Sequence, residues 1–321
     1  MDKPVHIHQT AEAPVARSSI RSWVDGHYAV DAAYDDDERC EWARVVPFIV
    51  VHLACGLAWY TGVSPVALGV CLALFAVRMF AITAFYHRYF SHRTFQTSRV
   101  FAFLGAALAN SSAQRGPLWW AAHHRAHHKH SDEDPDLHSP LKRGFWHAHV
   151  LWFLTRGSFR TRTELVPDLV KQRELVWLDR FDWVAPVVLL FACLGLGWAL
   201  GTWYPELGTS ALQMGVWGFC ISTVLLFHAT FTVNSLAHAW GSRRFNTGDD
   251  SRNNLVLALL TFGEGWHNNH HHYPSSARQG FRWYEIDLTW YGLLLLQCLG
   301  LVRKVRGVPE RVLAQAEGAQ Q

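Results

Sequence analysis

Charged residues are scarce in this chain of 321 residues, and they are unevenly spread. Asp, Glu, Lys and Arg make up 17% of the residues, whereas soluble domains carry roughly 25%. None of them occurs over residues 45–77, and Glu206 is the only one over residues 183–242. A soluble surface needs charge, so stretches of this length exclude an ordinary soluble domain and indicate a membrane protein.

Several features of secreted or nucleic-acid-binding proteins are also missing. The six cysteines form no CxxC pair, so we expect small buried hydrophobes and not a disulfide or zinc framework. Residues 1–40 lack the apolar core of a signal peptide. The formal net charge of +3 is too small to indicate a nucleic-acid partner.

Four stretches of the chain are apolar and long enough to cross a bilayer, which takes roughly 20 helical residues. We expect spans over about 43–60, 66–85, 183–204 and 212–235. Residues 61–65 form a turn of helix breakers between the first two spans. Four spans in two hairpins put both ends of the chain on one side of the membrane.

The distribution of Lys and Arg predicts which side that is. Fourteen of the 29 fall in the loop over residues 87–182, nine follow Ser242, and five lie at or before Arg44. The short loops over 61–65 and 205–211 contain none. By the positive-inside rule, the two ends and the middle loop are cytoplasmic. The compact chain predicts a multi-pass protein of a bacterial inner membrane.

The expected fold is all-α, with four transmembrane helices in two hairpins and a cytosolic helical cap. We expect an N-terminal tail over residues 1–42, a membrane domain over 43–303 and a C-terminal tail over 304–321. Two apolar stretches, 100–108 and 293–302, are too short to span. They are expected to lie at the membrane interface or to pack on the cap.

Histidine, in contrast to charge, is abundant, with 20 residues. The clusters are His87 and His92, then His123-His124-Arg125-Ala126-His127-His128, then His238, and His267-Asn268-Asn269-His270-His271-His272. All four segments map to the cytoplasmic side or to its membrane boundary. They are therefore expected to converge at one place.

The histidine spacing predicts metal binding. On a helix, residues at i, i+3 and i+4 share a face, and two triplets have this spacing: His124, His127, His128 and His267, His270, His271. Three imidazoles on one face, presented twice, can chelate a pair of metal ions. His87 and His92 need a helix end or an irregular turn to point together. Imidazole binds Zn, Cu, Fe and Ni alike, so ligand type does not choose the metal.

The remaining histidines are assigned other roles. His52 and His228, alone in apolar spans, are expected to be packing residues. His123 and His272 extend the triplets but lie off the shared face. We expect surface groups or neighbours of the ligands at four further positions, His130, His138, His147 and His149.

Four motifs in order carry a resemblance to a known family. They are His87-Arg88-Tyr89-Phe90-Ser91-His92, His124-Arg125-Ala126-His127-His128-Lys129, Asn234-Ser235-Leu236-Ala237-His238, and Gly263-Glu264-Gly265-Trp266-His267-Asn268-Asn269-His270-His271. With these motifs and their intervals over about residues 42–300, the chain resembles the membrane fatty acyl desaturases of the stearoyl-CoA desaturase type. The lead-in Gly263 to Trp266 is more specific than histidine spacing alone.

The resemblance implies a fold and a ligand set. The fold has four helices in a cone, with a cytosolic cap that holds the metals. The implied metal ligands are His87, His92, His124, His127, His128, His238, His267, His270 and His271. Asn234 matches an asparagine that holds one metal through a water molecule.

The implied cofactor is a pair of iron ions, with O2 as co-substrate. Such a centre removes two hydrogens from adjacent methylenes and leaves a cis double bond, here Δ9 in a saturated C16 or C18 chain. The chemistry supports a redox metal, because an alkyl C–H bond offers neither an acidic proton nor a carbonyl to polarise.

The resemblance also implies a bent apolar tunnel for the acyl chain, with its floor between the second and fourth spans. Phe75 is the candidate for its end, although packing against a neighbouring helix explains it equally well. Arg115, Lys129, Lys142 and Arg143 are suited to bind phosphates of the substrate, or to anchor the chain at the membrane.

The acyl carrier stays open between CoA, acyl carrier protein and an intact phospholipid. The animal acyl-CoA enzymes have Arg-Asp before the second histidine motif, where this chain has Ala122-His123. The acidic run Asp132-Glu133-Asp134-Pro135-Asp136 follows that motif with altered spacing.

A separate electron donor is expected as a partner, because the chain contains neither a His-Pro-Gly-Gly haem signature nor a nucleotide-binding fingerprint. The candidates are a ferredoxin or cytochrome b5, each with its reductase. The basic cytoplasmic face would suit an acidic donor.

Two alternatives remain at this stage. A histidine-motif membrane hydroxylase, of the alkane or sterol type, would insert oxygen; the Asn234–His238 element and the Gly263 lead-in argue against it. A metal transporter would place its ligands near the bilayer midplane, where only His52 and His228 are expected. A bis-histidine haem protein is disfavoured because so many histidines lie outside the spans.

Overall fold

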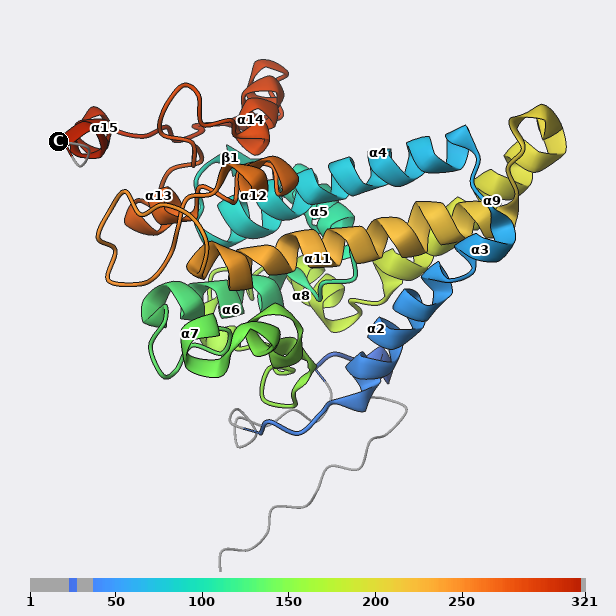
Figure 1. The fold of residues 1–321 in the computed structure, drawn as a ribbon, viewed down its shortest axis with the longest axis horizontal. Coiled ribbons are helices and arrows are strands. Elements are labelled where there is room, and N and C mark those ends of the chain that lie inside the picture. The colour runs from blue at the N-terminus through green and yellow to red at the C-terminus, as the bar shows by residue number, and fades with distance from the viewer. Residues whose placement is uncertain (1–22, 28–36, 319–321) are drawn as a thin grey trace, which may run out of the picture.

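The computed structural model describes residues 23–27 and 37–318, and these are almost entirely helical (Figure 1). Four helical stretches are long and apolar enough to cross a membrane: Trp42–Thr61, Pro65–Ser91, Val184–Trp203 and Ala211–His238. Four helices of spanning length were expected, and the structure contains four such candidates. The second and fourth are longer than expected, because they continue through polar, histidine-bearing turns.

The four stretches are built from consecutive helical elements. The first contains α2 (Trp42–Cys55) and α3 (Ala58–Thr61), and the second contains α4 (Pro65–Ala81) and η2 (Ile82–Ser91). The third is α9 (Val184–Trp203), and the fourth contains α10 (Ala211–Met214), η7 (Gly215–Ile221), α11 (Ser222–Ser235) and η8 (Leu236–His238).

The remaining elements are short. Between the second and third spans lie β1 (Gln96–Thr97), α5 (Arg99–Asn110), α6 (Pro117–His130), α7 (Pro140–Arg143), η3 (His147–Leu151), η4 (Trp152–Leu154), η5 (Thr163–Leu165) and α8 (Arg173–Arg180). Between the last two spans lies η6 (Pro205–Leu207). After the fourth span come α12 (Leu255–Leu260), α13 (His267–His272), α14 (Leu288–Cys298), β2 (Val302–Arg303) and α15 (Glu310–Gly318).

The turns between paired spans are set by local sequence. Gly62 has φ 61°, a left-handed conformation that costs glycine little. Ser64 caps α4 by accepting a hydrogen bond from the Ala67 amide, and Pro65 occupies the first helical position. Ser210 caps α10 in the same way, through the Gln213 amide. Each connection is therefore short, and the chain reverses at once.

The two pairs of spans are packed differently. In the second pair, α9 lies against α10 and η7. In the first pair, α2 packs on η7, η4 and α11, and α4 packs on η7, η2 and α11. Figure 1 shows α2 and α4 meeting near α3 and diverging toward the other end of the molecule. Each helix of the first pair thus finds its main partners in the fourth span.

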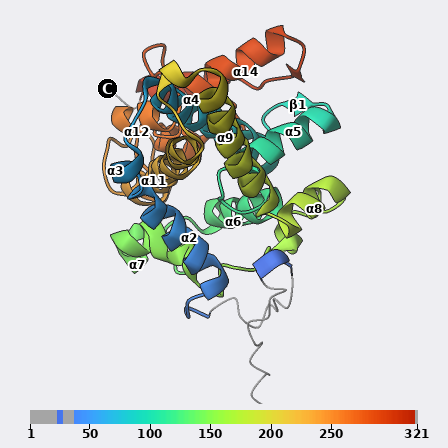
Figure 2. The ribbon, with the colours of Figure 1, turned by 90° about the vertical axis from the view of Figure 1, so that its right-hand side faces the viewer.

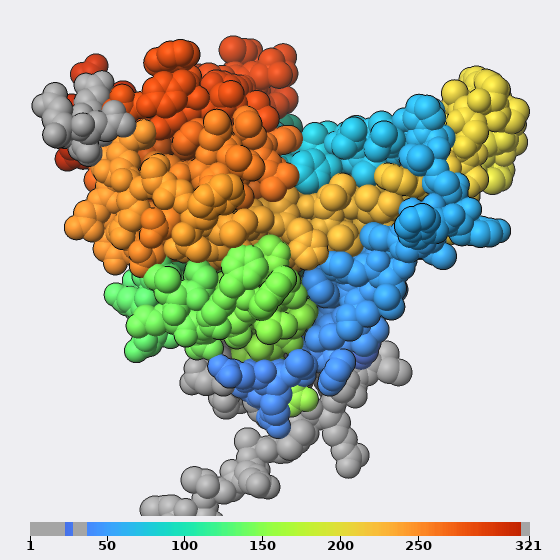
Figure 3. Space-filling view, viewed as in Figure 1, coloured from blue at the N-terminus to red at the C-terminus, as the bar shows by residue number. Residues whose placement is uncertain are grey.

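The histidine-bearing elements lie together at the end of the molecule opposite α3. Figure 3 shows that this end is the broader one, built mainly from segments before and after the last two spans. Figure 2, seen from the α3 end, shows α5, α8 and α14 outside the group of long helices. The long helices thus lead to a broader end of the molecule, where the histidine-bearing elements lie.

Arg78 is a charged residue inside the second span, and it is fully buried. Its guanidinium donates to the Leu74 carbonyl at 3.1 Å and to the Ser111 carbonyl at 3.2 Å. It also donates to Thr223 Oγ1 at 2.8 Å and Ser222 Oγ at 2.5 Å in the fourth span. These acceptors satisfy the side chain without a carboxylate.

The two shorter apolar stretches form α5 and α14, and both expose large hydrophobic side chains. Val100 of α5 is 70% exposed and Leu295 of α14 is 61% exposed. The second helix begins earlier than expected, because Asp287 caps it by accepting from the Trp290 amide. The strand β1, before α5, pairs antiparallel with β2, after α14, and so holds the start of α5 near the end of α14. This pairing was not expected, since two-residue strands carry no alternating pattern.

The expected terminal tails are only partly described. Residues 1–22, 28–36 and 319–321 lie outside the described part of the chain. Within the expected C-terminal tail, α15 places Val312 in a small core with Phe245 and Phe281. Near the N-terminus, the Gly26 amide bonds to the Arg180 carbonyl of α8.

Candidate metal centre

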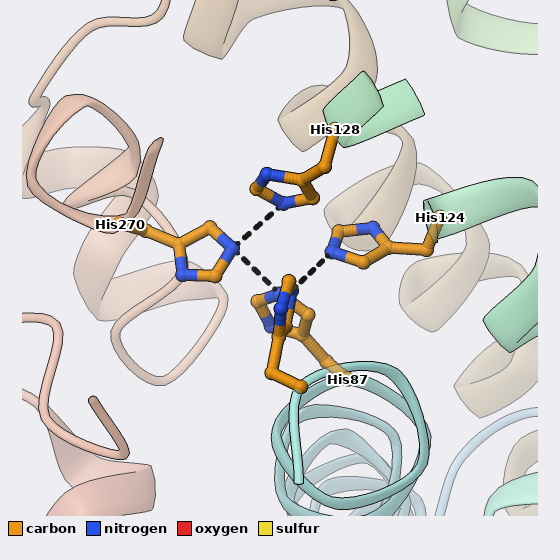
Figure 4. A group of neighbouring side chains, drawn as sticks. His87, His124, His128 and His270 are labelled. Atoms are coloured by element: carbon orange, nitrogen blue, oxygen red, sulfur yellow. Dashed lines mark hydrogen bonds between the residues drawn. The ribbon is translucent and has the colours of Figure 1, made fainter. Parts of the chain in front are cut away.

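Five histidines meet in a first cluster. Its members are His87 in η2, His92 directly after it, His124 and His128 in α6, and His270 in α13, with one ring nitrogen of each within 4.8 Å of the others. The Nε2 atom of His270 lies 3.0 Å from that of His87 and 2.9 Å from that of His128. Figure 4 shows these rings, with that of His124, pointing toward one another.

Four more histidines form a second cluster beside the first. Its members are His127 in α6, His238 in η8, and His267 and His271 in α13, again within 4.8 Å of one another. The Nε2 atoms of His238 and His267 are 3.0 Å apart. The ring centroids of His128 and His271, one from each cluster, are 4.4 Å apart. The nine histidines named from the resemblance are thus the nine of these two clusters.

Each histidine triplet is divided between the clusters. In α6 the first and last histidines, four residues apart, belong to the first cluster, and His127 belongs to the second. In α13 the assignment is reversed, and only His270 belongs to the first cluster. Successive helical residues differ by about 100° around the axis, so positions i and i+4 are about 40° apart and i+3 lies about 60° to the other side. One helix face therefore supplies two adjacent sites.

The wide turns of η2 bring His87 and His92 together. The His92 amide bonds to the His87 carbonyl at 3.3 Å, the i to i+5 bond of a π-helix. Their ring centroids are 4.9 Å apart. An α-helix bonds residues four apart and would separate these two side chains. The irregular turn expected from their spacing is therefore a π-helix that continues the second span.

The ring nitrogens are arranged as ligands of cations. In both clusters the contacts join Nε2 to Nε2 at 2.8 to 3.0 Å. Two such nitrogens can share only one proton, and the Nε2 of His270 meets two others. Nε2 of His271 and Nδ1 of His267 are buried without a hydrogen-bond partner among the described residues. Converging lone pairs are stabilised by a metal ion, so these residues fit a pair of metal sites.

A carboxylate lies behind four of the clustered histidine rings and fixes their orientation. Nδ1 of His127 donates to Asp136 at 3.0 Å, and Nδ1 of His238 donates to Asp132 at 2.8 Å. The other two pairs are His271 with Asp249 at 2.6 Å and His87 with Glu264 at 2.5 Å. A proton held on Nδ1 leaves the Nε2 lone pair free to bind metal, the usual arrangement of metal-bound imidazoles.

The protonation of most of these groups is consistent with metal binding; His127 differs, because neighbouring carboxylates, chiefly Asp136, raise its pKa against the effect of burial. Burial and neighbouring imidazoles hold the pKa values of five clustered histidines well below the usual range: His92, His124, His128, His267 and His270. Burial lowers the pKa of His271 to about 4, against the opposing effect of Asp249. Burial alone would raise the pKa of Asp132, but its interactions with His238 and its hydrogen bonds with Ser139 and the Asp250 amide together lower it to about 2. Neutral imidazole beside ionised carboxylate is the form that binds metal.

The four supporting carboxylates are functional residues that sequence reasoning did not assign. Asp132 and Asp136 belong to the acidic run after α6, which was noted only as a departure from the family pattern. Asp249 belongs to the pair Asp249-Asp250. The available signal was acidic residues close to histidine motifs, and this spacing does not say which carboxylate meets which ring.

Glu264 explains the specific lead-in to the last motif. Its carboxylate also accepts from Gln279 Nε2 at 2.9 Å and pairs with Arg88 at 3.1 Å. A Cβ on Gly263, where φ is 121°, would overlap the Asp287 side chain. A Cβ on Gly265 would overlap the α12 backbone. Both glycines permit the close approach that places Glu264 beside His87.

An apolar cavity of about 620 Å³ reaches the centre, a volume within the range of about 300–1,000 Å³ for ligand sites. Its wall includes Asn234, which lies near the end of α11 on the same wall as His127 and His267. Much of the remaining wall is apolar or aromatic, with Phe48, Met79, Ile82, Trp119, Trp152, Leu190, Phe227 and Phe231. The centre therefore opens onto a space suited to a hydrocarbon chain.

Phe75 and Arg115, the two candidate substrate residues, differ in position. Phe75 is not part of the cavity wall; its ring meets Phe262 edge-on, with centroids 6.4 Å apart. The structure thus supports the packing alternative for Phe75. Arg115 does line the cavity, where it pairs with Asp182 at 3.0 Å and donates to the Phe159 carbonyl at 2.7 Å. Burial lowers the pKa of Arg115 to about 10.

The other histidines make contacts outside the two clusters. His138 lies beside a ligand, with its ring centroid 4.4 Å from that of His127. Nδ1 of His123 donates to the Trp119 carbonyl at 3.0 Å, and the His123 ring packs on the Trp119 ring. His52 and His228 bond to each other at 3.2 Å between the first and fourth spans. His228 also bonds to His149 at 3.1 Å.

The sequence matches known desaturases over most of its length. The profile of the fatty acid desaturase family matches residues 63–297. The sn-2 palmitoyl-lipid 9-desaturase of Nostoc sp. (strain 36) is 39% identical over 280 residues, covering 84% of this chain and 92% of that protein. This match favours desaturation over the hydroxylase and transporter alternatives.

Two plant relatives extend the comparison. The Delta-9 acyl-lipid desaturase 1 of Arabidopsis thaliana is 36% identical over 272 residues, covering 84% of each chain. The acyl-CoA C20 Delta5-desaturase of Anemone leveillei is 39% identical over 247 residues, covering 76% of this chain and 74% of that protein. The chain therefore belongs to the membrane fatty acid desaturase family and is a fatty acyl desaturase.

Proposed function

We propose that this chain uses two iron ions and O2 to place a cis Δ9 double bond in a saturated C16 or C18 acyl chain. The observation that carries the proposal is the pair of histidine clusters at the end of an apolar cavity. The names of the Nostoc and Arabidopsis relatives, both 9-desaturases, support the position of the double bond.

The first cluster would hold one iron through five imidazoles. The second would hold the other through four imidazoles, with Asn234 acting through a water molecule. When bound, the iron pair supplies the oxidising power that an unactivated C–H bond requires. The carboxylates of Asp132, Asp136, Asp249 and Glu264 keep the Nδ1 protons in place and the Nε2 atoms turned toward the metals.

The cavity wall would position the acyl chain and keep water away from it. Met79, Ile82 and Phe227 give an apolar surface along which methylenes bind without specific polar contacts. Because the wall includes His87 and His124, a chain filling the cavity brings one pair of methylenes next to the centre. Proximity then selects the pair that is oxidised.

The reaction also defines a partner. One O2, two electrons, two protons and the two hydrogens of the acyl chain give two water molecules and a double bond. The electrons would come from a separate donor, a ferredoxin or cytochrome b5 with its reductase. Lys129, exposed directly after the ligand His128, offers a cation for an acidic donor.

The side of the membrane follows from the charges. With Lys and Arg concentrated in the middle loop and beyond Ser242, the metal centre would face the cytoplasm. We propose that this membrane is a bacterial inner membrane.

The test is expression in a host that makes no unsaturated fatty acids, with a matched electron donor. We expect gas chromatography of the fatty acid methyl esters to show a new Δ9 monounsaturated C16 or C18 acid. A product that has gained oxygen would instead assign a hydroxylase. No new product despite bound iron and a competent donor would refute the proposal.

Two variants connect the product to the clusters. His270→Ala should abolish the product and lower the iron content, because this ring contacts two others in the first cluster. His272→Ala is the matched control, since its ring stacks on Phe245 outside both clusters.

Asn234→Ala should leave protein levels near normal and weaken activity. Full activity of either His270→Ala or Asn234→Ala would remove that residue from the site.

A further inference from the structure

The mouth of the cavity indicates where the acyl chain comes from. The relatives described above include desaturases of acyl-lipid and of acyl-CoA, so their names do not decide the carrier. We infer that the cavity opens sideways into the bilayer between α2 and α9 and accepts an acyl chain of an intact phospholipid. This inference rests on the proposed function, because it names the carrier for the same site.

The side walls of the mouth consist of residues on the membrane-facing surface. Val50 of α2 and Val187 of α9 both line the cavity, yet they are 56% and 37% exposed. Their neighbours Leu53 and Val188 are 73% and 61% exposed and do not line it. The cavity is therefore continuous with the outer surface along these two helices.

The opening extends well into the hydrocarbon layer. The helices α2 and α9 begin at Trp42 and Val184, at the end of the molecule where the metal centre lies. With a rise of about 1.5 Å per residue, Val50 lies about 12 Å and Ala54 about 18 Å along α2. Half of the hydrocarbon core is about 15 Å thick. Val50 and Ala54 thus line the cavity at depths where the surrounding solvent is lipid.

Polar and aromatic groups lie at the start of the same helices. Trp23 and Trp183 line the cavity there, as expected for a membrane interface. Arg44 and Arg115 also line it, and both pair with Asp182, each at 3.0 Å. Two guanidinium groups thus share one carboxylate at the mouth.

These arginines retain hydrogen-bonding capacity. The Nε atoms of Arg44 and Arg115 are buried and have no hydrogen-bond partner among the described residues. The nearby Asp179 does not supply one, because its carboxylate accepts from the Trp119 amide and from Thr161. Guanidinium groups bind phosphate well, often through two parallel hydrogen bonds. A phospholipid with its chain in the cavity would carry a phosphate at this level.

A water-soluble carrier has fewer binding groups here. CoA carries several phosphates and would need additional cations around a mouth that faces water. Lys142 and Arg143, candidates for that role, are paired with Asp134 at 2.9 Å and Glu38 at 2.7 Å. The unpartnered Nε atoms of Arg44 and Arg115 at the mouth suit a single phosphate at the membrane surface.

The experiment compares carriers with the full-length, iron-loaded protein in nanodiscs and a matched electron donor. The three substrates are dipalmitoyl phosphatidylglycerol in the disc, palmitoyl-CoA, and palmitoyl acyl carrier protein. We expect mass spectrometry of the intact lipid to show a loss of two hydrogens when neither soluble carrier is present. Desaturation of only a soluble carrier would overturn this inference and leave the proposed function intact. Turnover of none of the three would overturn both.

A pair of adjacent variants tests the route itself. Val187→Trp should block the mouth, whereas Val188→Trp adds the same side chain to the outer surface of α9 only. We expect Val187→Trp to lower phospholipid desaturation at least about tenfold and Val188→Trp to leave it unchanged. A phospholipid with a photoreactive acyl chain gives a readout without turnover, and its cross-linking should fall in parallel. Equal cross-linking of Val187→Trp and the unmodified protein would exclude this route.

Discussion

Asp249 illustrates how a residue outside the two histidine clusters can control a proposed metal ligand. Its carboxylate accepts from Nδ1 of His271 at 2.6 Å and from the Ser251 amide at 3.0 Å. Burial favours its neutral form, but the interactions with His271 and the hydrogen bonds from Ser251 and Thr247 together outweigh burial and hold the pKa of Asp249 well below its usual range. The ionised carboxylate therefore orients the His271 ring and increases its basicity.

Asp249→Asn should weaken metal binding without unfolding the protein. The amide keeps the shape of the side chain but loses the charge, and changes of this kind cost about 10–100-fold in metal affinity. Titration of the metal-free protein with Fe(II), or with Co(II) as a spectroscopic probe, measures this affinity.

The matched control is Asp250→Asn. The neighbouring Asp250 side chain pairs with Arg243 and Arg252 and contacts no ligand ring. The metal affinity of the Asp250→Asn variant should equal that of the unmodified protein. Equal losses in both variants would show a general effect of charge and remove the assigned role of Asp249.

Individual residues could be predicted from the sequence only where a motif marks them. The nine clustered histidines were found because their spacing and order are distinctive. The carboxylates behind them were not, because Asp249 and Glu264 come from different loops and reach their rings only after the chain folds. Phe75 was the candidate for the end of the tunnel, but its ring faces Phe262 and not the cavity.

The contact between α5 and the second span depends on the absence of one side chain. A Cβ on Gly105 of α5 would overlap the ring of Phe85 in η2. That ring is 3% exposed and lies between Phe95 and Phe101 at centroid distances of 6.0 and 5.6 Å. It has no free space into which to move.

Gly105→Ala should therefore destabilise the fold by about 1–3 kcal/mol, the usual cost of overpacking a core. A thermal-unfolding midpoint measured in detergent should fall. Gly69→Ala in α4 is the control, because a Cβ there meets nothing within 4 Å. It should be neutral or slightly stabilising, since alanine favours a helix by up to about 1 kcal/mol over glycine. Similar midpoints for both variants would contradict the packing argument.

Helices could be predicted well where hydrophobicity defines them and less well at polar ends. The spans were identified because runs such as residues 184–203 contain no charge. The π-helical turns of η2 were not predictable in detail, because the residues that favour them also fit an α-helix. The division of each triplet between two clusters depends on how α6 and α13 face each other, which is a tertiary property.

The orientation of the whole molecule can be tested with its own cysteines. Cys40 and Cys298 are the exposed cysteines of the chain. In a Cys298→Ser background, Cys40 marks the start of α2, and Glu206→Cys marks the turn between the last two spans. A membrane-impermeant maleimide should label Glu206→Cys in right-side-out vesicles and Cys40 in inside-out vesicles.

Labelling both kinds of vesicle after detergent treatment provides the control for reactivity. The reverse pattern would place the metal centre on the outer side of the membrane and contradict the orientation inferred from Lys and Arg. Labelling of both sites from one side would contradict the four-span arrangement.

At the scale of the whole molecule, composition predicted the class of protein and the number of spans. It did not predict that α2 and α4 diverge from their connecting turn, since this depends on how each packs on α11 and η7. Nor did it predict that α15 packs against the segment around Phe245. These arrangements come from contacts between distant segments, for which a single sequence carries little signal.

Arg78 has a consequence for how the protein is made. An arginine at the centre of a spanning helix raises the free energy of membrane insertion by about 2.5–3.5 kcal/mol. Two of its acceptors, Ser222 and Thr223, belong to the fourth span, which leaves the ribosome more than a hundred residues later. During synthesis Arg78 therefore lacks these two acceptors until the fourth span has been made. The fourth span thus completes the polar environment of Arg78 in the second span.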